Sequence, residues 1–150
     1  MAANVSAQMK DAIKFAFGVL GAWALIYLSV TAYGLAAAYL PVPRSWWREF
    51  SWFVIYGTEV ISFVPFALVG ALAAFKFFKA KRVLQSFACF FIALLISFSS
   101  LAFETPEAVG AALRLSLEFI IIFVVGVPLL VFLLQRRANR SLQGTAFGGP

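Results

Sequence analysis

Four long apolar runs, separated by short polar segments, dominate the chain. They cover about residues 15–40, 52–75, 83–103 and 113–134. Each run has at least the roughly 20 residues that a helix needs to span the hydrocarbon core of a bilayer. An apolar segment of this length must be helical in lipid, because hydrocarbon offers no partner for free backbone groups. The pattern therefore predicts an all-α membrane protein, a bundle of four transmembrane helices.

The first run is the longest, and we expect it to tilt or to protrude from the bilayer. Its length exceeds the roughly 7–15 apolar residues of a signal peptide, so we expect it to be retained as a helix. Pro41 and Pro43 follow it and end the helical hydrogen-bond ladder. The pattern predicts one transmembrane domain over residues 1–140. Residues 141–150 are polar and Gly-rich and are expected to form a flexible cytoplasmic tail.

Lysine and arginine are divided unequally between the two sides that these helices define. Nine fall on the side of both termini, and three fall on the other side. Because every loop is short, the excess of positive charge marks the cytoplasmic side and predicts an N-in, C-in topology. Three tryptophans on the opposite side, Trp46, Trp47 and Trp52, are expected to anchor that interface. The nine basic residues are Lys10, Lys14, Lys76, Lys79, Lys81, Arg82, Arg136, Arg137 and Arg140.

The composition agrees with lipid as the solvent. The chain is 63% hydrophobic and 12% charged, with a mean hydropathy of +0.96, whereas soluble domains are about 45–50% apolar and about 25% charged. The net charge of +6 does not indicate nucleic-acid binding, because the basic residues form short clusters between apolar runs. We expect anionic lipid at the cytoplasmic face to be their partner. The short loops indicate a bacterial inner membrane.

Residues that could support catalysis are scarce. The chain has one cysteine, Cys89, and no histidine, which excludes internal disulfides and the usual zinc, haem and iron–sulfur ligand sets. Asp11 is the only aspartate, and no nucleophile elbow or phosphate-binding loop occurs. We therefore expect no enzyme activity, no cofactor and no metal. Cys89 lies within an apolar run and is interpreted as a small core residue.

Glu59 and Glu118 are acidic residues inside apolar runs. An ionisable side chain at the bilayer centre costs about 2.5–3.5 kcal/mol, so it usually marks an ion pair or a functional site. Both residues lie roughly 8–10 Å below the outer boundary. Glu107, Arg114 and Glu118 fall on one helical stripe, so Arg114 could sit between the two acids. A structural ion pair is favoured, and a proton or cation site that opens outward is the alternative.

Small residues recur at a spacing of four in the first two runs. This spacing lets helix backbones approach closely in lipid. Packing of these two helices within the chain is favoured over a homodimer. The candidate packing residues are Gly18, Ala22, Ala32 and Ala36 in the first run, and Ala67, Gly70, Ala71 and Ala74 in the second; Gly34 and Ala38 repeat the spacing.

These features favour a non-catalytic accessory, assembly or protective partner of a larger membrane protein, or a homo-oligomer. The four-helix, both-ends-in topology resembles that of immunity proteins that protect bacteria from pore-forming toxins, although no residue carries the likeness. Small multidrug transporters need a Glu in the first helix, and quinone-linked disulfide enzymes need cysteine pairs; the chain has neither. The alternative is a small proton- or cation-coupled transporter or channel that uses Glu59 and Glu118.

Overall fold

The computed structural model describes residues 2–78, 81–102, 117 and 120–146, and within them every regular element is a helix. The all-α class predicted from the sequence is confirmed, with four long helices in the described part of the chain. A short helix between the first two long ones is not predicted by the apolar pattern. The elements are α1 (Ala2–Tyr39), α2 (Arg44–Glu49), α3 (Ser51–Phe77), α4 (Arg82–Ala102) and a π-helical segment η1 (Ile120–Gly126) that continues into α6 (Val127–Ala146).

Three helical segments are long and apolar enough to cross a membrane: Gln8–Tyr39, Ser51–Phe77 and Ile120–Arg140. The described apolar part of α4, Arg82–Ser97, is shorter. Over its full length, Arg82–Ala102, α4 has 21 residues and is about 32 Å long at 1.5 Å per residue. The structure thus indicates an integral membrane protein, while the fourth crossing and the orientation stay predictions.

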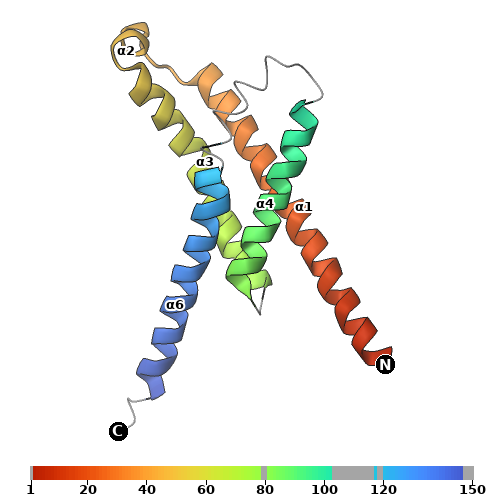
Figure 1. Ribbon diagram of the computed structural model, residues 1–150. Helices are drawn as coiled ribbons and strands as arrows, with labels where there is room; N and C mark the ends of the chain where they lie inside the picture. The colour runs from red at the N-terminus through yellow and green to blue at the C-terminus, as the bar shows by residue number, and fades with distance from the viewer. Residues whose placement is uncertain (1, 79–80, 103–116, 118–119, 147–150) are drawn as a thin grey trace.

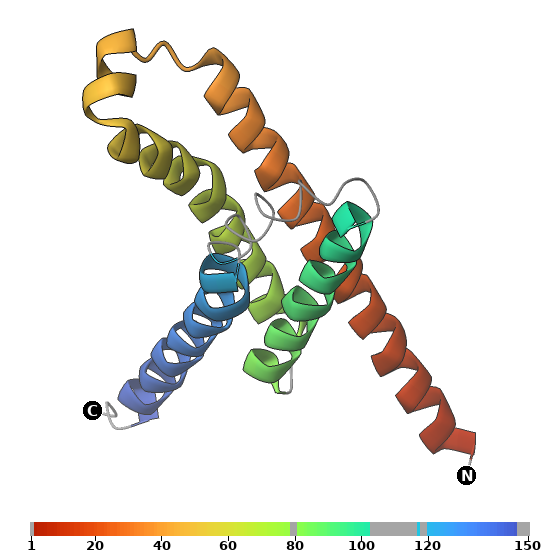
Figure 2. The same ribbon diagram turned by 45° about the horizontal axis from the view of Figure 1, so that its top comes forward.

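The helices cross near the middle of the bundle and diverge toward its ends (Figures 1 and 2). α1 packs against α3 and α4, and α6 packs against the same two helices. α3 and α4 are consecutive but touch each other only slightly, so they stand on one diagonal of the bundle and α1 and α6 on the other. Both termini lie at the end where α3 gives way to α4, here called the terminal end; α2 marks the opposite end (Figure 1).

The core lies where the four long helices cross. Phe63 of α3 and Phe123 of η1 are fully buried, and Phe90 of α4 stacks on Phe123 with ring centroids 5.9 Å apart. Ala71 and Ala93 are buried in the same core cluster. Lipid tails are as apolar as these side chains, so close packing rather than exclusion of water holds the helices together. Rings set against alanine and glycine provide that packing.

In the described part of the chain, the last long helix starts with the wider, π-helical segment η1. This segment ends at Gly126, two residues before Pro128. A proline lacks the backbone N–H of a regular helix and crowds the carbonyl four residues earlier, and interruptions of this kind are where helices kink or widen. α6 then runs on to Ala146, well past residue 134, where the apolar run ends. The helix therefore takes in the first residues of the segment predicted to be a tail.

Candidate functional site

The buried face of α3 carries Glu59, the acidic residue that the sequence singles out. This face is polar in its first half, with Thr58, Glu59 and Ser62, and small or aromatic further on. Glu59 is only 7% exposed and lies about 10 Å into the apolar run at 1.5 Å per residue. The Thr58 hydroxyl donates to the Val54 carbonyl at 2.7 Å. Glu59 has an interaction partner. Burial of a carboxyl group at this depth requires such a partner.

Arg114 and Glu118, the other members of the predicted charge cluster, lie outside the described residues, so the cluster stays a prediction. The structure does give the surroundings of Glu59. One turn further along α3, Phe63 is fully buried and contacts the ring of Tyr33 in α1, with centroids 5.7 Å apart. A polar path that entered at the α2 end would meet this ring pair directly after Glu59.

The candidate packing residues differ in how deeply they are buried. At two of these positions, both glycines, the nearest neighbour is the ring of a phenylalanine and not the backbone of a facing helix. A Cβ at Gly18 would lie 2.7 Å from Cζ of Phe78, and a Cβ at Gly70 would lie 2.8 Å from Cζ of Phe90. Ala22, Ala67, Gly70, Ala71 and Ala74 are buried, whereas Gly18, Ala32 and Ala36 are half-buried and Gly34 and Ala38 are exposed.

The candidate anchors gather at the α2 end. Trp46 in α2 and Trp52 at the start of α3 are 50% and 71% exposed, and Trp47 belongs to α2 as well. Trp46 packs edge-on against Phe50, and Trp52 stacks on Tyr56, with centroids 6.3 and 6.0 Å apart. Exposed rings with a polar tip suit the boundary between lipid and water.

One exposed aromatic pair is missed by the sequence analysis. Trp23 and Tyr27 stack on the outside of α1 with centroids 6.0 Å apart, and they are 39% and 63% exposed. The signal that could have revealed the pair is its place in the middle of an apolar run. Trp and Tyr are normally enriched at the two ends of such a run, at the membrane–water interfaces.

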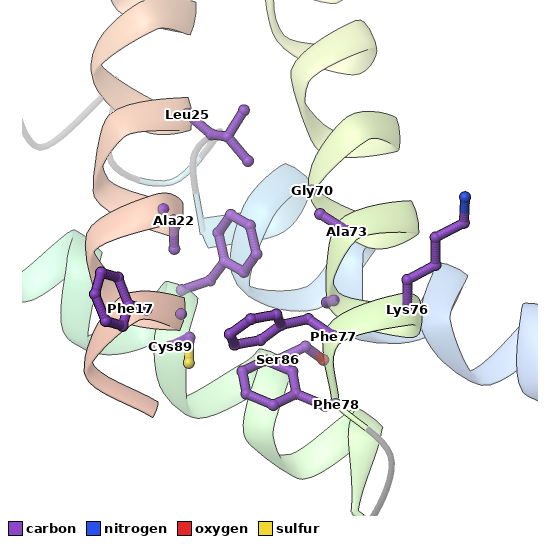
Figure 3. A pocket seen from close by; sticks show the side chains of 14 residues that line it. Phe17, Ala22, Leu25, Gly70, Ala73, Lys76, Phe77, Phe78, Ser86 and Cys89 are labelled. Carbon is purple, nitrogen blue, oxygen red and sulfur yellow. The ribbon is translucent and has the colours of Figure 1, made fainter. Parts of the chain in front are cut away.

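A cavity of about 400 Å³ lies between α1, α3 and α4 toward the terminal end. The polar side chains in its wall are directed at backbone carbonyls: the Ser86 hydroxyl donates to Val83 at 2.9 Å, and the Cys89 thiol lies 3.9 Å from the Phe15 carbonyl. Lys76 belongs to the wall, but its ammonium group points away from the cavity (Figure 3). The interior is otherwise apolar, with Phe17, Ala22 and Leu25 of α1 opposite Gly70 and Ala73 of α3 (Figure 3).

No known protein family, curated protein or solved structure matches this chain. Among the residues that the structure describes, no three His, Cys, Asp or Glu side chains gather as a metal site would need. Three features of the molecule are therefore the candidates for function: Glu59, the Trp23–Tyr27 pair and the apolar cavity.

Proposed function

We propose that this chain is a non-catalytic integral membrane protein that binds a larger membrane protein through helix packing, as an accessory, assembly or protective subunit. The observation that carries the proposal is an uncovered face of α1, here called the outer face. Its residues recur every three or four positions and form one stripe. They are Leu20, Ala24, Tyr27, Thr31, Gly34 and Ala38, with Trp23 beside Tyr27, and all seven are exposed.

The depth of Tyr27 makes this face unusual for one that meets only lipid. At 1.5 Å per residue Tyr27 lies about 20 Å along α1 from Lys14 and about 18 Å from Tyr39. Half of a hydrocarbon core is about 15 Å thick, so Tyr27 falls near the midplane. In the described part of the chain its ring contact is with Trp23, and its hydroxyl makes no hydrogen bond. Such a group is stabilised when a neighbouring helix supplies an acceptor.

The same face offers room for that helix. Gly34 has no heavy atom within 4 Å of the position of a Cβ, and Thr31 directs its hydroxyl to the Tyr27 carbonyl of its own helix. Small residues beside polar ones form the contacts through which transmembrane helices associate, because they allow close approach and a hydrogen bond across the interface. A partner helix with a hydroxyl or carbonyl acceptor level with Tyr27 would fit.

The proposed orientation places both termini in the cytoplasm of a bacterial cell, at its inner membrane. The nine-to-three division of basic residues supports this orientation. So does the arrangement in Figure 1, with both termini at one end and the Trp-bearing α2 at the other. The scarcity of catalytic and metal-binding residues supports a role without chemistry of its own.

Site-specific photo-crosslinking in intact membranes tests the proposal. A photoreactive phenylalanine analogue at position 24 or 31 should form a discrete crosslink to one larger membrane protein. The matched control is position 69, because Val69 is 54% exposed on α3 but lies off the outer face. Crosslinks that are equal at all three positions, or that join only lipid, would refute the proposal; a crosslink to a second copy would make the partner a homo-oligomer.

A conservative pair of variants measures the contribution of the hydroxyl. Tyr27→Phe should weaken recovery of the crosslinked partner, since hydrogen bonds between transmembrane helices contribute about 0.6–1.7 kcal/mol. Tyr39→Phe makes the same change at the end of α1, where the side chain is 79% exposed, and should have no effect. Equal partner recovery in the two variants would show that the Tyr27 hydroxyl takes no part in docking.

The second candidate function is a small proton- or cation-coupled transporter or channel. The observation that favours it is the burial of Glu59 on a face shared with Thr58 and Ser62. In a transporter, Glu59→Gln would fold but lose function, because an amide cannot change its charge. In an accessory subunit, the same variant would retain partner binding.

A further inference from the structure

We propose that the cavity between α1, α3 and α4 holds one acyl chain of an anionic phospholipid. The headgroup would lie at the terminal end of the bundle, against Lys76, Lys81 and Arg82. This site is separate from the outer face of α1 and does not depend on the partner proposed above.

The size and lining of the cavity select an apolar occupant. Its volume of about 400 Å³ falls within the roughly 300–1,000 Å³ of ligand-binding pockets. Apolar cavities of about 150 Å³ already take up benzene-sized molecules and stay free of water. The Ser86 hydroxyl donates its proton to a backbone carbonyl, so it is not available as a donor to a polar ligand. In a bilayer the apolar molecule beside the opening is a lipid tail.

The inner wall of the cavity is closely packed, while Phe17 and Phe77 at its open side are 64% and 46% exposed. Phe78, Cys89 and Phe90 in the wall are at most 5% exposed. At Gly18 an added Cβ would collide with Phe78 and Cys89, but at Gly21 no heavy atom lies within 4 Å of the position of a Cβ. Gly21 is exposed and lines the open side of the cavity, so a larger side chain there would narrow the cavity without displacing its walls.

Charge at the rim selects the headgroup. Lys76 lies in the last turn of α3, Lys81 precedes α4 and Arg82 begins it, with no acidic residue between positions 76 and 82. Arg82 is fixed there, because its Nε donates to the Phe78 carbonyl at 2.7 Å and its guanidinium lies 4.4 Å from the centre of the Phe75 ring. The Lys76 ammonium points away from the cavity (Figure 3), so its long, flexible side chain would have to turn to reach a headgroup at the rim.

Native mass spectrometry of the full chain in detergent tests the acyl-chain site. Phosphatidylglycerol and phosphatidylcholine with identical acyl chains serve as the probes. The parent protein should retain one phosphatidylglycerol, and Gly21→Leu should lose it. Gly34→Leu is the matched control, since Gly34 also has no neighbour within 4 Å but lies outside the cavity. Equal retention of lipid by the two variants, or no retained lipid in the parent, would overturn the proposal.

Two further variants separate folding from binding and the headgroup from the tail. Ala73→Leu fills the cavity from α3 and should reproduce the loss if Gly21→Leu fails to fold. The double variant Lys76→Gln, Lys81→Gln should weaken phosphatidylglycerol binding about fivefold for each lysine removed, at ~1 kcal/mol for each. Phosphatidylcholine binding should not change. Equal affinity of the parent for the two lipids would overturn the assignment of an anionic headgroup.

Discussion

Addition of one methyl group at Gly70 should destabilise the bundle, whereas the same change at Gly34 should not. A Cβ at Gly70 would lie 2.8 Å from Cζ of Phe90 and 3.3 Å from Cδ1 of Leu25, while Gly34 has no heavy atom within 4 Å. Phe90 cannot swing aside freely, because it is 3% exposed and stacked on Phe123. The methyl group must therefore push α4 or α1 away from α3.

The expected magnitude follows from three contributions. Overpacking of a closely packed interior costs about 1–3 kcal/mol, and disturbance of an aromatic pair costs about 0.5–1.5 kcal/mol more. Replacement of glycine by alanine within a helix returns about 1 kcal/mol. Gly70→Ala should thus lose about 0.5–3.5 kcal/mol of stability. Gly34→Ala, which has only the last contribution, should gain up to about 1 kcal/mol.

Unfolding by sodium dodecyl sulfate in mixed micelles, followed by circular dichroism, measures both variants against the parent. A double-mutant cycle with Phe90→Leu then identifies the cause, because the shorter side chain leaves room for the new methyl group. Gly70→Ala should cost much less stability in the Phe90→Leu background than in the parent. The packing described around Gly70 would be wrong if Gly70→Ala were as stable as Gly34→Ala, or if its cost were the same in both backgrounds.

Three further predictions concern topology and charge. On a Cys89→Ala background, an impermeant thiol reagent applied from outside the cell should label a cysteine at position 48 but not one at position 10; the reverse result would invert the proposed orientation. Arg114→Ala should reduce expression and thermal stability more than Arg48→Ala, because loss of one partner of a buried ion pair costs about 3–5 kcal/mol. Equal stability of the two variants would contradict the predicted ion pair of Arg114. Glu59→Gln should keep the helical content and the crosslinks of the parent, and a folded variant that loses its crosslinks would argue against the accessory role.

The apolar runs predict the long helices well, because a helix in lipid needs little beyond length and hydrophobicity. The start of α3 at Ser51 and its end at Phe77 lie within two residues of the predicted run. The apolar runs do not predict α2, the start of α1 at Ala2 or the extension of α6 to Ala146, since all three lie outside those runs. Their helical form depends on local backbone preference, which is a weak guide to structure.

The candidate sites could be predicted only where one helix suffices to define them. Glu59 is recognisable from its own run, because a carboxyl group among apolar residues is conspicuous in the sequence. The cavity is not recognisable in this way, since it depends on Gly21 of α1, Ala73 of α3 and Phe90 of α4 being brought together. Spacing singles out Gly18 and Gly70 but cannot reveal that phenylalanine rings fill the space beside them.

The diagonal placement of α3 and α4 has a consequence for the order in which the bundle assembles during synthesis. The first two long helices to be made, α1 and α3, pack closely, whereas α4 touches α3 only slightly. α1, made earlier, is the helix that first joins them, because it packs against both. α6, made last, then closes the opposite side. A chain that stalled before α6 would leave one flank of α3 and α4 open to membrane chaperones and proteases.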